Sequence, residues 1–504
     1  MIEGPGELEV DHLNHDTTRS RRRFFHRAAH GTMGAALAYL ASRDFAGADT
    51  LSAGSGIQPA THGPRRVYDF QQRQTHFPAK AKAVIHLFMN GGPSQVDLFD
   101  PKPKLDQHHG EPYFNDIAQD VSSPEQAGGL MRSPFKFDRY GESGAWVSNV
   151  MPHLQKHVDK IAIIRSMYNS HPNHEPALFK IHSGRLLPGR PSIGAWVAYG
   201  LGSVNQNLPA YVVLDDPLGL PVNTVQSWQN GFLPPVYQGT RIRSQGSPIL
   251  NLHAQDADPD PVVQVQRDLL RRIDNIHRKK RPNNLELDAR INSYELAARM
   301  QLEAADVLDI SQESQATLDA YGVGNKTTDS YARRCIMARR MVERGVRFVQ
   351  LYINGQIWDN HSDIRNGLPA ACNRTDQPVA QLLEDLKQRG LLDDVLVVWG
   401  GEFGRLPIAQ VSDRKNLQTA GRDHGPRGFS LWMAGGGIKP GVSYGNTDDI
   451  GFAAVENRVS IADWHATILH QLGLHHEDLF FERNGLKDKL TDTFKPRIVK
   501  EILA

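Results

Sequence analysis

The stretch VVWGGEFGRLP at 397–407 carries two residues with clear chemical potential. An apolar run leads through two glycines to a carboxylate at Glu402 and a guanidinium at Arg405. Glu402 could bind a metal ion, and Arg405 offers a planar fork of donors that matches a tetrahedral oxyanion. At i,i+3 spacing the same two residues could instead form an ion pair that caps the following turn. The choice depends on the other side chains that reach the same place.

Further polar residues flank other short apolar runs. In an open parallel sheet, ligands bind beyond the carboxyl ends of the strands, so we expect these side chains at one edge. Carboxylates and imidazoles without thiols suit one or two divalent ions of zinc, manganese, magnesium, iron or calcium. Taken singly, an Asp-x-His or Asp-His pair in a glycine-rich loop is also typical of a hydrogen-bonded turn. The polar residues that flank the apolar runs are Asn90, Ser94, Asp97 and Asp100; His171, Asn173, His174 and Glu175; Asp359, His361 and Asp363; and Asp423, His424 and Arg427.

The order of elements predicts the scaffold that brings these residues together. Short apolar runs indicate buried strands, and helices of about four turns alternate with them in the second half of the chain. Such alternation favours parallel pairing through right-handed crossovers. The predicted fold class is α/β, a three-layer α/β/α sandwich with a mostly parallel central sheet. Strands are expected at 83–92, 159–167, 209–216, 346–353, 393–401 and 429–436, and helices at 329–345, 378–392 and 460–474.

Composition excludes several classes of function. Of the 504 residues, 57 are Lys or Arg and 56 are Asp or Glu, a formal charge of +1, so no global field attracts nucleic acid. With only Cys335 and Cys372, the chain is not a disulfide scaffold. Charged, helix-periodic sequence at about 261–321 predicts a helical insertion within one domain at 81–504.

The N-terminus predicts export. Ser20, Arg21, Arg22, Phe24 and Phe25 follow the order of a twin-arginine signal, and a mildly apolar run with small residues comes after them. We expect a signal peptide with an N-terminal extension at 1–48, a linker at 49–80, and a product in the periplasm or at the cell surface. The alternative for the first segment is a basic amphipathic helix on a solvated arm. No later segment reaches the roughly 18 consecutive apolar residues of a transmembrane anchor.

Several long motifs carry a family resemblance. HLFMNGGPSQVDLFDPKP, WDNHSD, VVWGGEFGRLP, DWHATILHQLGL and the segment from GRDHGPRG to GNTDDIG resemble the exported bacterial domain-of-unknown-function family 1501. The similarity covers roughly 80 to 500. That family is assigned to the alkaline phosphatase-like superfamily of phosphatases, sulfatases and phosphoglycerate mutases, which implies an alkaline phosphatase-like fold.

Only some of the superfamily's active-site residues have a matching residue in this sequence. Its distal histidine corresponds to His424, and its Asp-x-x-x-His loop is shortened here to Asp359 and His361. Its late Asp-His pair falls on Glu402 and Phe403, so an imidazole is lost.

Two further departures concern the first strand and the nucleophile. The superfamily's first-strand Asp falls on Asn90, unless Asp97 replaces it. The nucleophile position falls near Asn173 and His174, where there is no hydroxyl or thiol, and Ser170 is the nearest hydroxyl. Without such a group, a covalent phospho- or sulfo-enzyme has no obvious starting atom.

The leading hypothesis is therefore an exported metal-dependent hydrolase of phosphate or sulfate esters, acting on a small-molecule or glycan ester. Arg405 stabilises the oxyanion, and His174 completes the metal shell or attacks the substrate itself. The residues expected to hold one or two ions are Asp97, Asp359, His361, Glu402, Asp423 and His424.

Two alternatives belong to other classes of function. The first is a catalytically degenerate surface or periplasmic binding protein on the same fold, which the missing nucleophile favours. The second is a carbohydrate-binding module that uses Trp228, Trp358 and Trp432, although Trp432 lies in an expected strand, where a core position is typical. No nucleic-acid partner and no particular oligomeric state are indicated.

Overall fold

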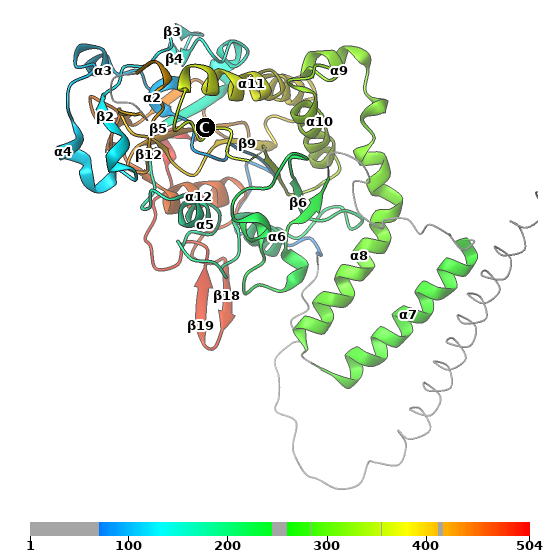
Figure 1. Ribbon diagram of the computed structural model, residues 1–504. Helices are drawn as coiled ribbons and strands as arrows, with labels where there is room; N and C mark the ends of the chain where they lie inside the picture. The colour runs from blue at the N-terminus through cyan, green and yellow to red at the C-terminus, as the bar shows by residue number, and fades with distance from the viewer. Residues whose placement is uncertain (1–69, 244–259, 283, 354, 412–416) are drawn as a thin grey trace, which may run out of the picture. The chain divides into compact units, whose positions relative to one another are not determined.

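The structure is a computed structural model of the 504-residue chain (Figure 1), and it describes residues 70–243, 260–282, 284–353, 355–411 and 417–504. The chain divides into two compact units, Met1–Arg65 and Arg66–Ala504, and the description concerns the second. The predicted signal peptide at 1–48 and positions 49–69 of the predicted linker lie outside the described residues.

A nine-stranded sheet forms the centre of this unit. Its order is β14-β5-β13-β9-β1-β8-β6-β7, and β17 pairs with β5 at one edge. Every pairing is parallel except those of β13, which runs antiparallel to both β5 and β9. The predicted α/β class with a mostly parallel sheet is confirmed. The strands are β1 (Ala83–Phe88), β5 (Ile161–Tyr168), β6 (Tyr211–Leu214), β7 (Thr240–Ile242), β8 (Phe348–Tyr352), β9 (Val395–Gly400), β13 (Phe429–Ala434), β14 (Val442–Tyr444) and β17 (Val459–Ser460).

Helices cover both faces of the sheet. In Figure 1, α10 and α11 lie on one side, and α5, α6 and α12 lie on the other. Local sequence fixes several helix ends: α12 starts with a capping box of Ser460 and Asp463, and α5 ends at Gly184 with a φ of 79°. These helices are α5 (His174–Ser183), α6 (Ile193–Leu201), α10 (Asp329–Glu343), α11 (Ile364–Gln388) and α12 (Ile461–Gln471).

The remaining helices and short strands lie outside the central sheet. The 261–321 segment contains α7 (Asp260–Lys280), α8 (Leu285–Leu308) and α9 (Gln315–Tyr321). Among the described residues, no helix has the length and apolar character needed to cross a membrane. The other elements are α2 (Gln95–Leu98), α3 (Pro103–Gln107), α4 (Phe114–Ile117), β2 (Ala127–Leu130), β3 (Phe137–Tyr140), β4 (Ala145–Ser148), β10 (Gly404–Arg405), β11 (Ile408–Gln410), β12 (His424–Gly425), β15 (Asn446–Thr447), β16 (Ala454–Glu456), β18 (Phe480–Arg483) and β19 (Leu486–Lys489).

The three tryptophans of the carbohydrate-binding hypothesis are core residues. Trp228, Trp358 and Trp432 are all fully buried. A sugar-stacking surface needs an exposed ring, so these residues do not provide one.

Three histidines are buried between the sheet and the helices α5 and α12. His86, His182 and His465 lie together, and the side chains of Gln350 and Tyr352 hydrogen-bond to His182. Burial lowers the pKa of His86 to about 3 and that of His465 to about 4, and it lowers the pKa of His182 as well. The folded state therefore keeps these rings neutral while the unfolded chain takes up protons below about pH 6.5.

We expect the free energy of unfolding to fall as the pH drops from about 6.5 towards 4. Each such histidine contributes a slope of up to about 1.4 kcal/mol per pH unit, because only the unfolded state binds its proton in this window. Urea unfolding at about pH 7 and pH 5 measures the effect. His86→Phe should reduce the slope, because Phe88, Phe348 and Trp464 already surround the site with aromatic rings.

The exposed His475 provides the matched control for this experiment. His475→Ala should leave the slope unchanged. An equal slope in wild type and His86→Phe would contradict the assignment.

Candidate metal centre

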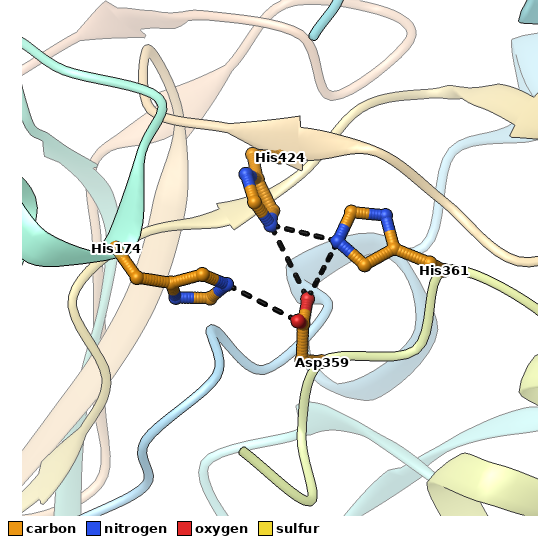
Figure 2. A group of neighbouring side chains, drawn as sticks. All are labelled: His174, Asp359, His361 and His424. Atoms are coloured by element: carbon orange, nitrogen blue, oxygen red, sulfur yellow. Dashed lines mark hydrogen bonds and ion pairs between the residues drawn. The ribbon is translucent and has the colours of Figure 1, made fainter. Parts of the chain in front are cut away.

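Four side chains converge at the carboxyl edge of the sheet. One potential ligand atom from each of His174, Asp359, His361 and His424 lies within 4.8 Å of every other (Figure 2). His174 is the first residue of α5, Asp359 and His361 follow β8, and His424 lies in β12 just before β13. The sequence placed all four at strand ends, and the tertiary structure brings them into one group.

The three imidazole Nε2 atoms gather around one carboxylate. The Nε2 atoms of His361 and His424 lie 2.9 and 3.2 Å from Asp359 Oδ1. His174 Nε2 lies 3.2 Å from Asp359 Oδ2, on the other oxygen. The Nε2 atoms of His361 and His424 are 2.9 Å apart.

Hydrogen bonds behind the rings fix their orientation. His174 Nδ1 donates to Glu402 Oε1 over 2.7 Å, and His361 Nδ1 donates to Gln410 Oε1. If a cation replaced the Nε2 protons, the remaining proton of each ring would stay on Nδ1 and the lone pair of Nε2 would face the centre. Metal-binding histidines typically show this arrangement, in which a carboxylate or amide oxygen holds the far nitrogen.

The group fits a divalent cation. The Nε2 atoms of His361 and His424 face each other at 2.9 Å and His174 Nε2 lies 3.2 Å from Asp359 Oδ2, so the lone pairs of the deprotonated rings would share one centre. A cation between the rings would satisfy these lone pairs. Three imidazoles with one carboxylate suit zinc, iron or manganese better than calcium or magnesium, which prefer oxygen ligands.

The electrostatics keep Asp359 ionised. Burial alone would raise its pKa, but hydrogen bonds from the three histidines and the charge of Arg405 hold the pKa well below the usual range. Burial also lowers the pKa of His174, yet the bonds to Asp359 and Glu402 outweigh it and raise the pKa to about 9. Burial lowers the pKa of His424 to about 4.

Arg405 lies behind this group and holds Asp359 in place. Its guanidinium donates to Asp359 Oδ1 over 2.6 Å and to the carbonyl oxygens of Gly91, Gly92 and Arg422. The side chain is 0% exposed. The predicted role of Arg405 in holding a substrate oxyanion does not fit this position, because the donors are directed at the protein's own oxygens.

The comparison with known families is decisive for the identity of the domain. A family described as "Protein of unknown function (DUF1501)" matches residues 81–503, most of the chain. The chain belongs to the DUF1501 family. This confirms the resemblance seen in the sequence motifs. No curated protein sequence matches the chain.

Solved structures similar to this DUF1501 protein include three enzymes. A phosphonate monoester hydrolase from Silicibacter pomeroyi matches at 11% identity and a TM-score of 0.36, over 84% of this chain and 76% of that one. A sulfatase from Pseudoalteromonas sp. matches at 12% sequence identity with a TM-score of 0.33, and the match covers 78% of this chain and 68% of the sulfatase chain. The alkaline phosphatase of the Antarctic bacterium TAB5 matches at 11% sequence identity with a TM-score of 0.34, and the match covers 80% of this chain and 100% of the phosphatase chain.

Three carboxylates predicted as ligands lie outside the group of four. Glu402 is completely buried and bonds to His174 Nδ1 and to the backbone N–H of Gly91. It therefore orients the His174 ring from behind.

The other two are committed to structural partners. Asp97 forms a fully buried ion pair with Arg422 and accepts from the Ser94 hydroxyl. Asp423 accepts from the backbone N–H groups of Ser122 and Ser123, which lie 301 and 300 positions away, so these contacts are not those of a local turn.

Sequence reasoning missed two residues that shape the site. Gln410, in β11, fixes His361, and Arg422 neutralises Asp97. An isolated Gln in an apolar strand carries no signal of a role in metal binding. Arg422 stands in the quoted GRDHG motif, but nothing in the spacing connects it to Asp97, 325 positions away.

For zinc bound by the four ligands, Glu402→Gln should weaken the affinity by about 10- to 100-fold. Replacing the charged acceptor makes the His174 imidazole a poorer donor to the metal. Competition with a chromophoric chelator measures the change. Glu142→Gln, at an exposed position, is the matched control and should bind zinc like wild type. Equal affinity of all three proteins would show that Glu402 does not act through His174.

Arg405→Lys should destabilise the fold by about 3–5 kcal/mol, because a lysine cannot replace the fork and leaves several of the buried carbonyl oxygens of Gly91, Gly92 and Arg422 without a donor. Urea unfolding of the metal-free protein measures it. Arg483→Lys changes a half-exposed guanidinium in the same way and should cost less than about 1 kcal/mol. A similar cost for both variants would contradict the role of Arg405.

Proposed function

We propose that this DUF1501 protein is an exported metal-dependent hydrolase of phosphate or sulfate esters. The observation that carries the proposal is the convergence of three imidazole nitrogens and one carboxylate on a common centre. The choice of ester rests on the family resemblance in the sequence motifs, which points to phosphatases and sulfatases. The substrate is a small-molecule or glycan ester.

The four ligands leave one side open to substrate. His361 is 34% exposed, whereas His174 and His424 are 12% and 10% exposed. Substrate therefore approaches over His361. A divalent ion at this centre would polarise an ester oxygen and lower the pKa of a bound water.

The protein's own residues favour water over a side chain as the attacking group. The group of four contains no hydroxyl or thiol, and Asn173 stands at the start of α5. His174 itself has its Nδ1 committed to Glu402 and its Nε2 directed at Asp359. In this arrangement His174 is a ligand and not a nucleophile.

A binding protein without turnover is the second candidate. Burial of Arg405 favours it, since this guanidinium is not available to stabilise charge on a substrate. A metal-loaded site that captures an anion without cleaving it would use the same four ligands.

The test combines metal content with turnover, using the chain from Asp49. We expect about one zinc, iron or manganese ion per chain, and loss of most of it in His361→Ala and His424→Ala. His475→Ala, which removes an exposed histidine outside the group, should keep the ion. The metal-loaded protein should hydrolyse aryl phosphates or aryl sulfates, and the two ligand variants should lose this activity by at least about 100-fold.

The outcomes separate the candidates. Metal that is lost in both variants, without turnover of any ester, would favour the binding protein. Folded wild type that takes up no metal after reconstitution would refute the hydrolase and the metal-dependent binding protein together.

A further inference from the structure

The helix α7, whose course is seen in Figure 1, has several exposed apolar side chains along one side. Val262 is 44% exposed, Val265 68%, Leu269 57% and Leu270 60%. Large apolar side chains exposed together mark interaction surfaces more often than chance. This stripe has no role in the metal centre or in the proposed hydrolysis.

Helix geometry shows that the neighbouring helix does not cover the stripe. At about 100° per residue, Arg278 lies about 180° around α7 from Leu269. Arg278 is the residue that faces α8, where its guanidinium lies 3.1 Å from Asp288 and donates to Asn292 over 2.9 Å. Val262, Val265 and Leu269 therefore point away from α8, and Leu270 lies to the side, about 80° from Arg278.

The charge of α7 departs from that of the chain as a whole. Residues 260–281 contain seven basic and three acidic side chains, whereas the whole chain has a formal charge of only +1. At the same 100° spacing, Arg272 and Lys279 lie about 60° and 80° from Leu269, both on the Val265 side of the stripe, and Lys280 extends the stripe at the C-terminal end. Long basic side chains beside an apolar stripe can reach an anionic surface while the stripe is buried.

We propose that α7 docks in the plane of an anionic lipid bilayer, with Val262, Val265, Leu269 and Leu270 inserted at the headgroup boundary. A helix with an apolar face and a basic polar face binds such surfaces through apolar burial and attraction to anionic lipids. A second copy of the chain is a poorer occupant of the stripe. Two α7 helices packed side by side in parallel would bring the basic C-terminal halves of both together, whereas an anionic surface can neutralise these charges.

Vesicle co-sedimentation of the chain from Asp49 tests the proposal. We expect binding to vesicles that contain phosphatidylglycerol, much weaker binding to pure phosphatidylcholine, and release at high salt. Leu269→Gln combined with Leu270→Gln should lower the binding constant more than tenfold. Arg272→Gln, Lys279→Gln and Lys280→Gln together should also lower it more than tenfold, at about fivefold per charge.

Two controls test whether the loss of vesicle binding is specific to α7. Val455→Gln changes an exposed apolar residue in β16 and should bind vesicles like wild type. Circular dichroism of each variant checks that the helices are retained.

Three outcomes would overturn the proposal. The first is no binding to either vesicle, and the second is equal loss of binding in Val455→Gln. The third is a concentration-dependent dimer, measured by light scattering, that the leucine variant abolishes while vesicle binding persists. This test reads lipid binding alone, so its result is independent of metal content and turnover.

Discussion

The buried guanidinium of Arg405 is the interaction on which the polar edge of the sheet depends. Its donors reach the carbonyl oxygens of Gly91 and Gly92 after β1, Asp359 after β8, and Arg422 before β12. A charge removed from water needs a counter-charge and a full set of acceptors. The hydrogen bonds of the Arg405 guanidinium therefore hold three loops from distant parts of the chain in one arrangement.

The candidate metal centre follows from that arrangement. Arg405 and His424 are direct partners in the short β10–β12 pairing, so the loop that presents one also presents the other. Close packing demands glycine at Gly91, where a Cβ atom would lie 2.6 Å from the backbone nitrogen of Asp359. Ligand geometry is thus set by buried backbone contacts and not by the exposed surface.

Histidine has two opposite uses in this fold. His86, His182 and His465 are held neutral in the core because burial disfavours charge. His174 lies at the sheet edge between two carboxylates, which favour its charged form enough to outweigh burial. The difference lies in the neighbouring charges and not in the sequence around each histidine. The helix α7 shows a different pattern, in which apolar and basic side chains are exposed on the same helix.

The sequence by itself determined the strand runs, the alternation with helices and the strand-end loops that carry the polar residues, because these depend on local periodicity and on the rule that parallel strands end at one edge. It did not reveal that β13 runs antiparallel: the described residues of 401–428, those outside 412–416, contain no crossover α-helix, and an antiparallel neighbour needs none.

Only the tertiary structure decided which carboxylate faces the centre. Asp359 does, whereas Glu402, Asp97 and Asp423 are committed to His174, Arg422 and backbone N–H groups. Spacing along a loop fixes where a side chain starts. Its direction is set by the buried partner that satisfies it, and that partner can lie 300 residues away.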